Sequence, residues 1–226
     1  MCLVLSDFSI DPMTVTTHLS FTRSHTLNGR GLTCVRGERT LFEDLNLHIA
    51  AGECLHVRGE NGIGKTSLLR LLAGLSAPEV GEVLFADQSI YTATEQYRQN
   101  LLFLGHRDAL KDDLTALENV TMYALLDNVP LKDDQALANL WRFGLRGRED
   151  LPVSCLSAGQ KKRVLMARMV ARQAQVWILD EPFNALDANA CMVLQDLISE
   201  HGAQGGITIL TSHQMLGIPN IQVLEL

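Results

Sequence analysis

Short apolar stretches separated by turn-forming residues predict a small β-layer near the start of the ordered chain. GLTCV, LNLHI and CLHV follow one another within residues 31–58, with GER and AAGE between them. Short β-prone runs joined by such turns are typical of an antiparallel layer. Because the ordered pattern begins near Arg30, we expect residues 1–29 to form a poorly ordered tail.

The last of these stretches leads into a glycine-rich segment and then into a leucine-rich one. The leucines recur at helical spacing and give one broad apolar face. They are Leu68, Leu69, Leu71, Leu72 and Leu75. This part of the chain therefore predicts the order strand, loop, helix.

The segments that follow predict helices and buried strands. Residues 113–145 have a mostly helical pattern, which begins at a T-x-x-E capping box formed by Thr115 and Glu118. LLFLG, VWIL and ITILT are apolar runs, and continuous runs of this kind are typical of parallel strands buried on both faces.

These elements predict one α/β domain over residues 30–226. It contains a parallel sheet, a small antiparallel β subdomain and a helical subdomain at about residues 106–165. The chain of 226 residues is long enough to bury a core of its own.

Charge and composition narrow the possible functions. The formal net charge of −7 argues against a nucleic-acid partner, because binding to phosphate backbones needs clustered Lys and Arg. No apolar run reaches the roughly 18 to 20 residues that span a bilayer, so a membrane role requires a separate membrane subunit. The first 28 residues lack the basic start of a secretory signal, and Met13 is an alternative start. The five scattered cysteines indicate reduced thiols in a cytosolic protein.

The strongest motif is a complete G-x-x-x-x-G-K-[ST] between the predicted strand and helix. Glycines let backbone N–H groups surround phosphates, and the helix that follows adds the positive end of its dipole. Lys65 is expected to reach the β and γ phosphates, and the Thr66 hydroxyl suits Mg²⁺. An ordinary glycine-rich turn is the alternative, but the flanking elements favour phosphate binding. The predicted nucleotide-binding residues here are Gly59, Glu60, Asn61, Gly62, Ile63, Gly64, Lys65, Thr66 and Ser67.

Two acidic residues follow VWIL, at the carboxyl end of a strand, where open α/β sheets bind ligands. Asp180 is expected to hold Mg²⁺ through water, and Glu181 to orient and polarise the attacking water. Pro182 favours an extended conformation for Glu181. Taken alone, DEP fits a helix cap equally well, but the upstream phosphate-binding loop favours catalysis.

LSAGQ at residues 156–160 precedes basic residues and a predicted helix. With the phosphate-binding loop before it and the acidic pair after it, this order resembles the ABC ATPase family, whose signature is LSGGQ. The resemblance implies ATP and Mg²⁺ as ligands and a pair of identical subunits. Ser157, Gly159 and Gln160 of one copy would then cover the γ-phosphate bound by the other. An ordinary capped helix is the alternative for this segment alone.

Two later residues extend the resemblance. Asp187, in ALD, matches the D-loop of the family, which implies a place at the dimer interface. His213, after ITILTS, matches the switch histidine, which implies contact with the γ-phosphate or with Glu181. Other histidines are interpreted as structural: His18, His25, His48, His56 and His201.

Two positions depart from the family pattern. Arg36 stands where the family has an aromatic that stacks on adenine; a guanidinium also stacks on flat rings, although a solvated surface arginine is the favoured alternative. His106 stands where the family has a glutamine. Because Mg²⁺ prefers oxygen ligands, the resemblance leaves the role of His106 open.

Several stretches are similar to the ATPase subunit of the heme exporter used in cytochrome c maturation, among them ERTLF, LLRLLAGLSAPEVGEVLF and LSAGQKKRV. The similarity implies a bacterial inner-membrane complex, with this subunit on the cytoplasmic face and integral membrane subunits as partners. Since the chain has no C-x-x-C-H motif, we do not expect it to bind heme itself. The alternatives are a lipoprotein or drug exporter ATPase, a soluble ABC ATPase, and a GTP-binding switch, whose N-K-x-D motif is absent.

Overall fold

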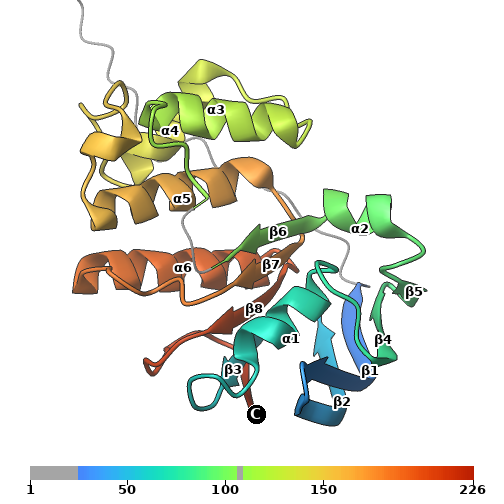
Figure 1. Ribbon diagram of the computed structural model, residues 1–226. Helices are drawn as coiled ribbons and strands as arrows, with labels where there is room; N and C mark the ends of the chain where they lie inside the picture. The colour runs from blue at the N-terminus through green and yellow to red at the C-terminus, as the bar shows by residue number, and fades with distance from the viewer. Residues whose placement is uncertain (1–24, 106–108) are drawn as a thin grey trace, which may run out of the picture.

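The computed structural model describes residues 25–105 and 109–226, and it contains two β-sheets and a helical layer (Figure 1). The predicted α/β class, with a parallel sheet, a small antiparallel sheet and helices, is confirmed. Residues 1–24, which make up most of the predicted tail, and His106 lie outside the described residues. Among the described residues, no helix combines the length and apolar character needed to cross a membrane.

The antiparallel sheet has the strand order β2-β1-β4-β5. Its strands are β1 (Thr26–Arg36), β2 (Arg39–Ala50), β4 (Val80–Phe85) and β5 (Gln88–Ser89). GLTCV and LNLHI belong to this sheet, as predicted. β1 begins at Thr26, ahead of the expected start at Arg30, because Thr26 pairs with β2 and residues 27–29 pair with both β2 and β4.

The parallel sheet has the strand order β6-β7-β8-β3-β9. Its strands are β3 (Cys54–Arg58), β6 (Leu101–Leu104), β7 (Val176–Leu179), β8 (Ile207–Thr211) and β9 (Ile221–Glu225). The placement of CLHV in the antiparallel layer was wrong. This stretch forms β3, which pairs in parallel with β8 and β9, and such distant pairing leaves no local turn signal.

The helices divide between the core and one helical layer. α1 (Lys65–Leu72), α2 (Thr94–Gln99) and α6 (Ala188–Ala203) accompany the sheets. α3 (Ala116–Leu126) and α4 (Asp133–Arg142) pack on α5 (Ala158–Arg172), above the rest in Figure 1, and η1 (Val153–Cys155) precedes α5. The capping box of Thr115 and Glu118 is present at the start of α3. Leu75, however, lies beyond α1 and is exposed.

Two apolar cores position the site. One lies around α1, whose leucines pack with buried residues from the parallel sheet, including Val57, Ile178 and Ile209. The other joins α3, α4, α5 and α6 to the opposite face of that sheet.

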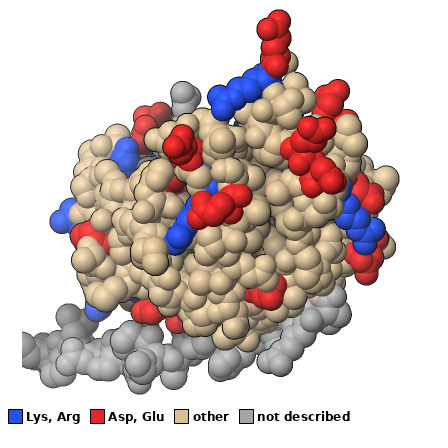
Figure 2. Space-filling view, turned by 90° about the horizontal axis from the view of Figure 1, so that it is seen from below, with Lys and Arg blue, Asp and Glu red and all other residues tan. Residues whose placement is uncertain are grey.

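Seen from the end that carries the C-terminus, basic side chains form separate groups beside acidic ones (Figure 2).

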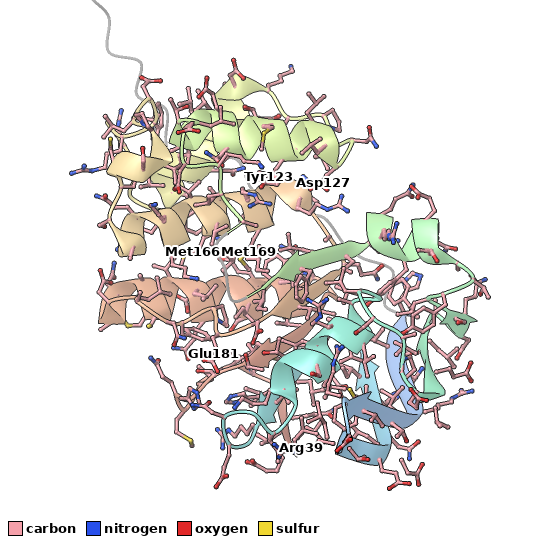
Figure 3. All side chains as sticks on the ribbon, in the orientation of Figure 1. Arg39, Tyr123, Asp127, Met166, Met169 and Glu181 are labelled. Carbon is pink, nitrogen blue, oxygen red and sulfur yellow. The ribbon has the colours of Figure 1, made fainter. Side chains whose placement is uncertain are left out.

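Two arginines of α5 contact neighbouring elements, and two of the residues that they contact, Tyr123 and Asp127, are labelled in Figure 3. The Arg168 guanidinium lies 3.3 Å from the centre of the Tyr123 ring on α3 and donates to the Ala109 carbonyl. Arg172 forms a 3.2 Å ion pair with Asp127 and donates to the Arg98 carbonyl. The helical layer is thereby joined to α2, the helix that precedes the edge strand β6.

His201 joins α6 to the parallel sheet. Its ring stacks on Trp177, with ring centroids 3.8 Å apart. Nε2 lies 3.0 Å from the Ala174 carbonyl oxygen and Nδ1 lies 3.1 Å from Thr208 Oγ1. A Cβ at Gly206 would overlap this ring, so the position requires glycine. Burial lowers the pKa of His201 to about 4.

This lowered pKa predicts a loss of stability in mild acid. A histidine in the unfolded chain has a pKa of about 6.5. Between about pH 6.5 and pH 4, His201 is therefore protonated in the unfolded chain but neutral in the folded protein. Above that window the residue is neutral in both states. We expect His201 to lower the free energy of unfolding by about 3 kcal/mol across the window.

The measurement is urea unfolding at several pH values for the wild type and His201→Asn. The variant is less stable at neutral pH, because the stack on Trp177 is lost, but its stability should fall less steeply on acidification. Equal slopes for the two proteins would contradict a buried neutral His201.

Candidate active site

The carboxyl ends of β3, β7 and β8 meet at one open pocket. Its volume is about 520 Å³. The phosphate-binding loop between β3 and α1 forms one wall, and the segments that follow β7 and β8 form the other. The lining residues are Leu41, Asn61, Gly62, Gly64, Lys65, Thr66, Ser67, Asp180, Glu181, Asn184 and His213.

The loop at residues 59–64 has the wrapped shape that phosphate binding needs. Gly59 and Gly64 have φ values of 134° and 130°, a region that residues with a side chain rarely adopt. A Cβ at Gly59 would also lie 3.0 Å from the Leu226 carbonyl oxygen. Lys65 Nζ donates to the carbonyls of Gly59 at 2.7 Å and Glu60 at 3.1 Å. The Lys65 ammonium group therefore lies over the phosphate-binding loop.

Asp180 is the centre of a hydroxyl network. Its carboxylate is buried and accepts from Thr66 Oγ1 at 2.8 Å through one oxygen and from Thr211 Oγ1 at 2.8 Å through the other. Hard oxygen atoms gathered at one edge of the pocket suit Mg²⁺. The residues present therefore fit a magnesium ion, which Thr66 and Asp180 would hold directly or through water.

Glu181 and His213 lie together at the pocket. His213 Nε2 is 3.5 Å from Glu181 Oε1, and the Glu181 side chain is only 13% exposed. The Glu181 N–H donates to Thr211 Oγ1 at 2.8 Å, which connects this residue to the Asp180 network. The carboxylate of Glu181 is thus held between β7 and β8, facing the phosphate-binding loop (Figure 3).

The extended conformation expected for Glu181 was wrong. Its φ is 52°, in the left-handed region. The influence of Pro182 is overridden because the chain turns where β7 ends, while the Glu181 N–H binds Thr211 and the Glu181 carbonyl accepts from the Asn184 N–H. A non-glycine residue in this region costs roughly 1 to 3 kcal/mol, and such strain is concentrated at functional sites.

The signature residues are not among those that line the pocket. Ser157 is the exposed N-cap of α5: its Oγ accepts from the Gln160 N–H at 3.3 Å, and the Gln160 side chain accepts from the Ser157 N–H at 2.9 Å. Gly159 lies beside this cap, and a Cβ there would be 3.6 Å from the Ala185 carbonyl oxygen. The signature thus adjoins the segment that follows Glu181.

Asp187 caps α6 and remains exposed. Its Oδ1 accepts from the Ala190 N–H at 2.7 Å, and this bond, followed by the charge of Arg163, lowers the pKa of Asp187. Arg163 Nη2 lies 3.4 Å from Asp187 Oδ2, while Nη1 donates to the Phe143 carbonyl at 3.1 Å. Arg163 therefore connects the signature helix to Asp187.

The structure does not bring Arg36 into the pocket lining. It is exposed at the hairpin between β1 and β2, where it lies opposite Arg39 in the strand register. Leu41, farther along β2, lines the pocket instead.

Sequence reasoning missed Leu41, Asn184 and Thr211. Asn184 is close to the acidic pair in sequence, and Thr211 ends the predicted strand ITILT, so position offered a signal for both. The Thr211 hydroxyl reaches Asp180 only because β7 and β8 are neighbours in the sheet.

Comparison with known proteins identifies the class. The family model described as ABC transporter matches residues 42–184, more than half of the chain. This chain therefore belongs to the ABC transporter family, and it is an ATPase of the ABC type.

The similar solved structures have the same fold. A putative ABC transporter ATP-binding protein from Pyrococcus furiosus has a TM-score of 0.77 at 22% identity, covering 88% of this chain and 97% of that one. A bacterial ABC transporter cassette solved as a dimer has a TM-score of 0.76 at 23% identity, covering 88% and 94%.

Curated relatives are considerably more similar in sequence. The cytochrome c biogenesis ATP-binding export protein CcmA of Haemophilus influenzae is 46% identical over 202 residues, which cover 89% of this chain and 95% of that protein. The protein of the same name from Escherichia coli is 46% identical over 197 residues, covering 87% and 93%.

Proposed function

We propose that this chain hydrolyses ATP as the peripheral subunit of a bacterial inner-membrane exporter that serves cytochrome c biogenesis, on its cytoplasmic side. The observation that carries the proposal is the sequence identity of 46% to 47% with relatives named cytochrome c biogenesis ATP-binding export protein CcmA. The matches cover nearly the whole length of this chain and of each relative. The oxygen-lined pocket with Glu181 beside it supports ATP hydrolysis.

Nucleotide binding uses the loop and the residues that follow it. The backbone N–H groups of residues 59–64 and the N-terminus of α1 attract the phosphates, and Lys65 adds a full positive charge. Thr66 and Asp180 would hold a magnesium ion, which would supply positive charge beside the phosphates. Ser67, in the first turn of α1, extends the polar lining.

Hydrolysis breaks the bond between the γ-phosphorus and the oxygen that bridges it to the β-phosphate, while the oxygen of water bonds to that phosphorus. Glu181 accepts a hydrogen bond from this water and orients it for in-line attack, and the proton that the water loses passes to the released phosphate or to solvent. His213 holds Glu181 and contacts the transferred phosphoryl group. The Asp180 and Thr211 network keeps Glu181 in place.

Two copies of the chain are needed to complete each site. Ser157, Gly159 and Gln160 of one copy contact the γ-phosphate held by the other, and Asp187 lies at the interface. Support comes from the exposure of Ser157 and Asp187 and from their position outside the pocket lining of their own chain. His106, which lies outside the described residues, would act through a water or report the nucleotide state to the membrane subunit.

The partners in this proposal are integral membrane subunits of the cytochrome c maturation complex, and we do not expect this chain to bind heme itself. The rival proposal is a lipoprotein or drug exporter, or a soluble ABC ATPase. The identity of the membrane subunits that associate with the chain separates these functions.

Complementation tests the proposal. The host is a bacterium whose own CcmA has been deleted. The wild-type chain is produced there together with the membrane subunits from its own source organism. We expect it to restore covalent heme attachment to c-type cytochromes. Glu181→Gln should bind the same membrane subunits without restoring attachment, because binding does not need hydrolysis. Association of the chain with another exporter, without any restored cytochrome, would contradict the assignment.

A further inference from the structure

His56 is fully buried in β3, the strand that leads into the phosphate-binding loop. Side chains alternate along a strand, and Leu55 and Val57 pack into the core around α1. His56 therefore points to the opposite face of the parallel sheet. An imidazole there needs polar partners, since an unpaired buried polar group is costly.

Both ring nitrogens of His56 have such partners. Nε2 lies 2.9 Å from the Ser212 carbonyl oxygen, and Nδ1 accepts from Arg58 Nε at 3.3 Å. Arginine is a donor only, so Nδ1 must be the acceptor, and Nε2 carries the hydrogen that it donates to Ser212. Burial lowers the pKa of His56, which favours this neutral form.

The partner of His56 is next to a proposed catalytic residue. The Ser212 carbonyl and the His213 N–H belong to one peptide unit, which is planar. A hydrogen bond that fixes this carbonyl therefore fixes the plane from which the His213 side chain departs. Thr211, on the other side of Ser212, is anchored to Asp180.

Other contacts secure the same segment. Arg58 Nη2 lies 3.3 Å from the Met215 sulfur, and the Gln214 N–H donates to Ser212 Oγ at 3.0 Å. His213 itself is largely exposed, with 59% of its side chain accessible, and it contacts Glu181 at 3.5 Å. The placement of His213 thus depends on the backbone of residues 212–215, which His56 and Arg58 of β3 contact.

We propose that His56 is a positioning residue for ATP hydrolysis, which holds the Ser212 carbonyl and so places His213 against Glu181. The proposal rests on the hydrolysis mechanism given above. It assigns His56 a role in turnover, in place of the structural role that the sequence indicates. The hydrogen bonds of the His56 ring go to Ser212 and Arg58 rather than to residues 59–67, so we expect nucleotide binding to be independent of them.

The test is steady-state ATPase activity of the full chain, in whichever form of the wild type hydrolyses ATP. His56→Leu keeps an apolar side chain of similar size but removes the donor to Ser212. We expect kcat to fall about tenfold or more, with KM for ATP within about twofold of the wild type. His56→Gln keeps an N–H donor at similar reach and should recover most of kcat.

His201 provides a matched control. Its Nε2 also donates to a buried carbonyl, that of Ala174 at 3.0 Å, but at the opposite end of the parallel sheet from the pocket. His201→Leu should lower the free energy of unfolding and leave kcat within about twofold, because it removes the same kind of bond away from His213. If His56→Leu does not fold, Arg58→Met replaces it, since Arg58 is half-buried and orients the His56 ring.

The outcomes separate the two proposals. No ATP hydrolysis by the wild type, alone or with its membrane subunits, would overturn the proposed function itself. With an active wild type, an unchanged kcat in His56→Leu, or in Arg58→Met where it replaces that variant, would overturn the positioning role. A change in KM alone, or an equal loss of kcat in His201→Leu, would do the same.

Discussion

Replacing Glu181 with glutamine is expected to lower the rate of ATP hydrolysis by at least about a hundredfold while ATP still binds. The amide has nearly the same shape, so the contact with His213 and the backbone bond to Thr211 can persist. It lacks the negative charge that polarises water. Lys65, Thr66 and Asp180 are unchanged, and the phosphates therefore keep their partners.

ATP that binds without turnover should hold two copies of the chain together. Sizing of Glu181→Gln with ATP and Mg²⁺, alone and with the membrane subunits, is therefore expected to show a dimer. Glu200→Gln is the matched control: Glu200 pairs with Arg142 at the surface, away from the pocket, and its loss should leave turnover unchanged. A species that stays monomeric under both conditions would contradict the role proposed for Ser157 and Gly159 across the interface.

Replacing Lys65 with alanine should weaken ATP binding at least about a hundredfold, or roughly 3 kcal/mol. The variant loses the positive charge at the loop, and it also frees the carbonyls of Gly59 and Glu60 that the ammonium group holds. The loss of the charge and the release of these two carbonyls both weaken the attraction of the loop for the phosphates. The measurement is titration with a fluorescent ATP analogue in the presence of Mg²⁺.

Lys132→Ala serves as the control for charge, because Lys132 is exposed at the start of α4. It should bind ATP with wild-type affinity. Normal affinity in Lys65→Ala, with the fold intact by circular dichroism, would show that the loop does not bind the phosphates through this residue.

Contacts between residues close in sequence were predictable. The loop at residues 59–64, the capping box of Thr115 and the apolar strands depend on local pattern and backbone chemistry. For the same reason the acidic pair could be placed at the end of β7 before the sheet was known.

Contacts that depend on strand order were not predictable. The position of β3 between β8 and β9 results from pairing across more than a hundred residues, and no turn announces it. The left-handed conformation of Glu181 is held in part by Thr211, which is distant in sequence. His56 is the clearest case, because a single histidine in an apolar stretch gives no indication that its partner is the Ser212 carbonyl.

The cap at the start of α5 has a consequence for what Ser157 can offer a neighbouring subunit. Its oxygen uses a lone pair to accept from the Gln160 N–H, and a hydroxyl group keeps its own hydrogen when it accepts. The Ser157 hydroxyl therefore accepts one hydrogen bond from the helix and can still donate one to a partner outside it. A phosphate bound to another copy can accept a hydrogen bond from this hydroxyl without unwinding the first turn of α5. Aspartate at this position would cap the helix equally well but would meet the phosphate with a negative charge and no proton to donate.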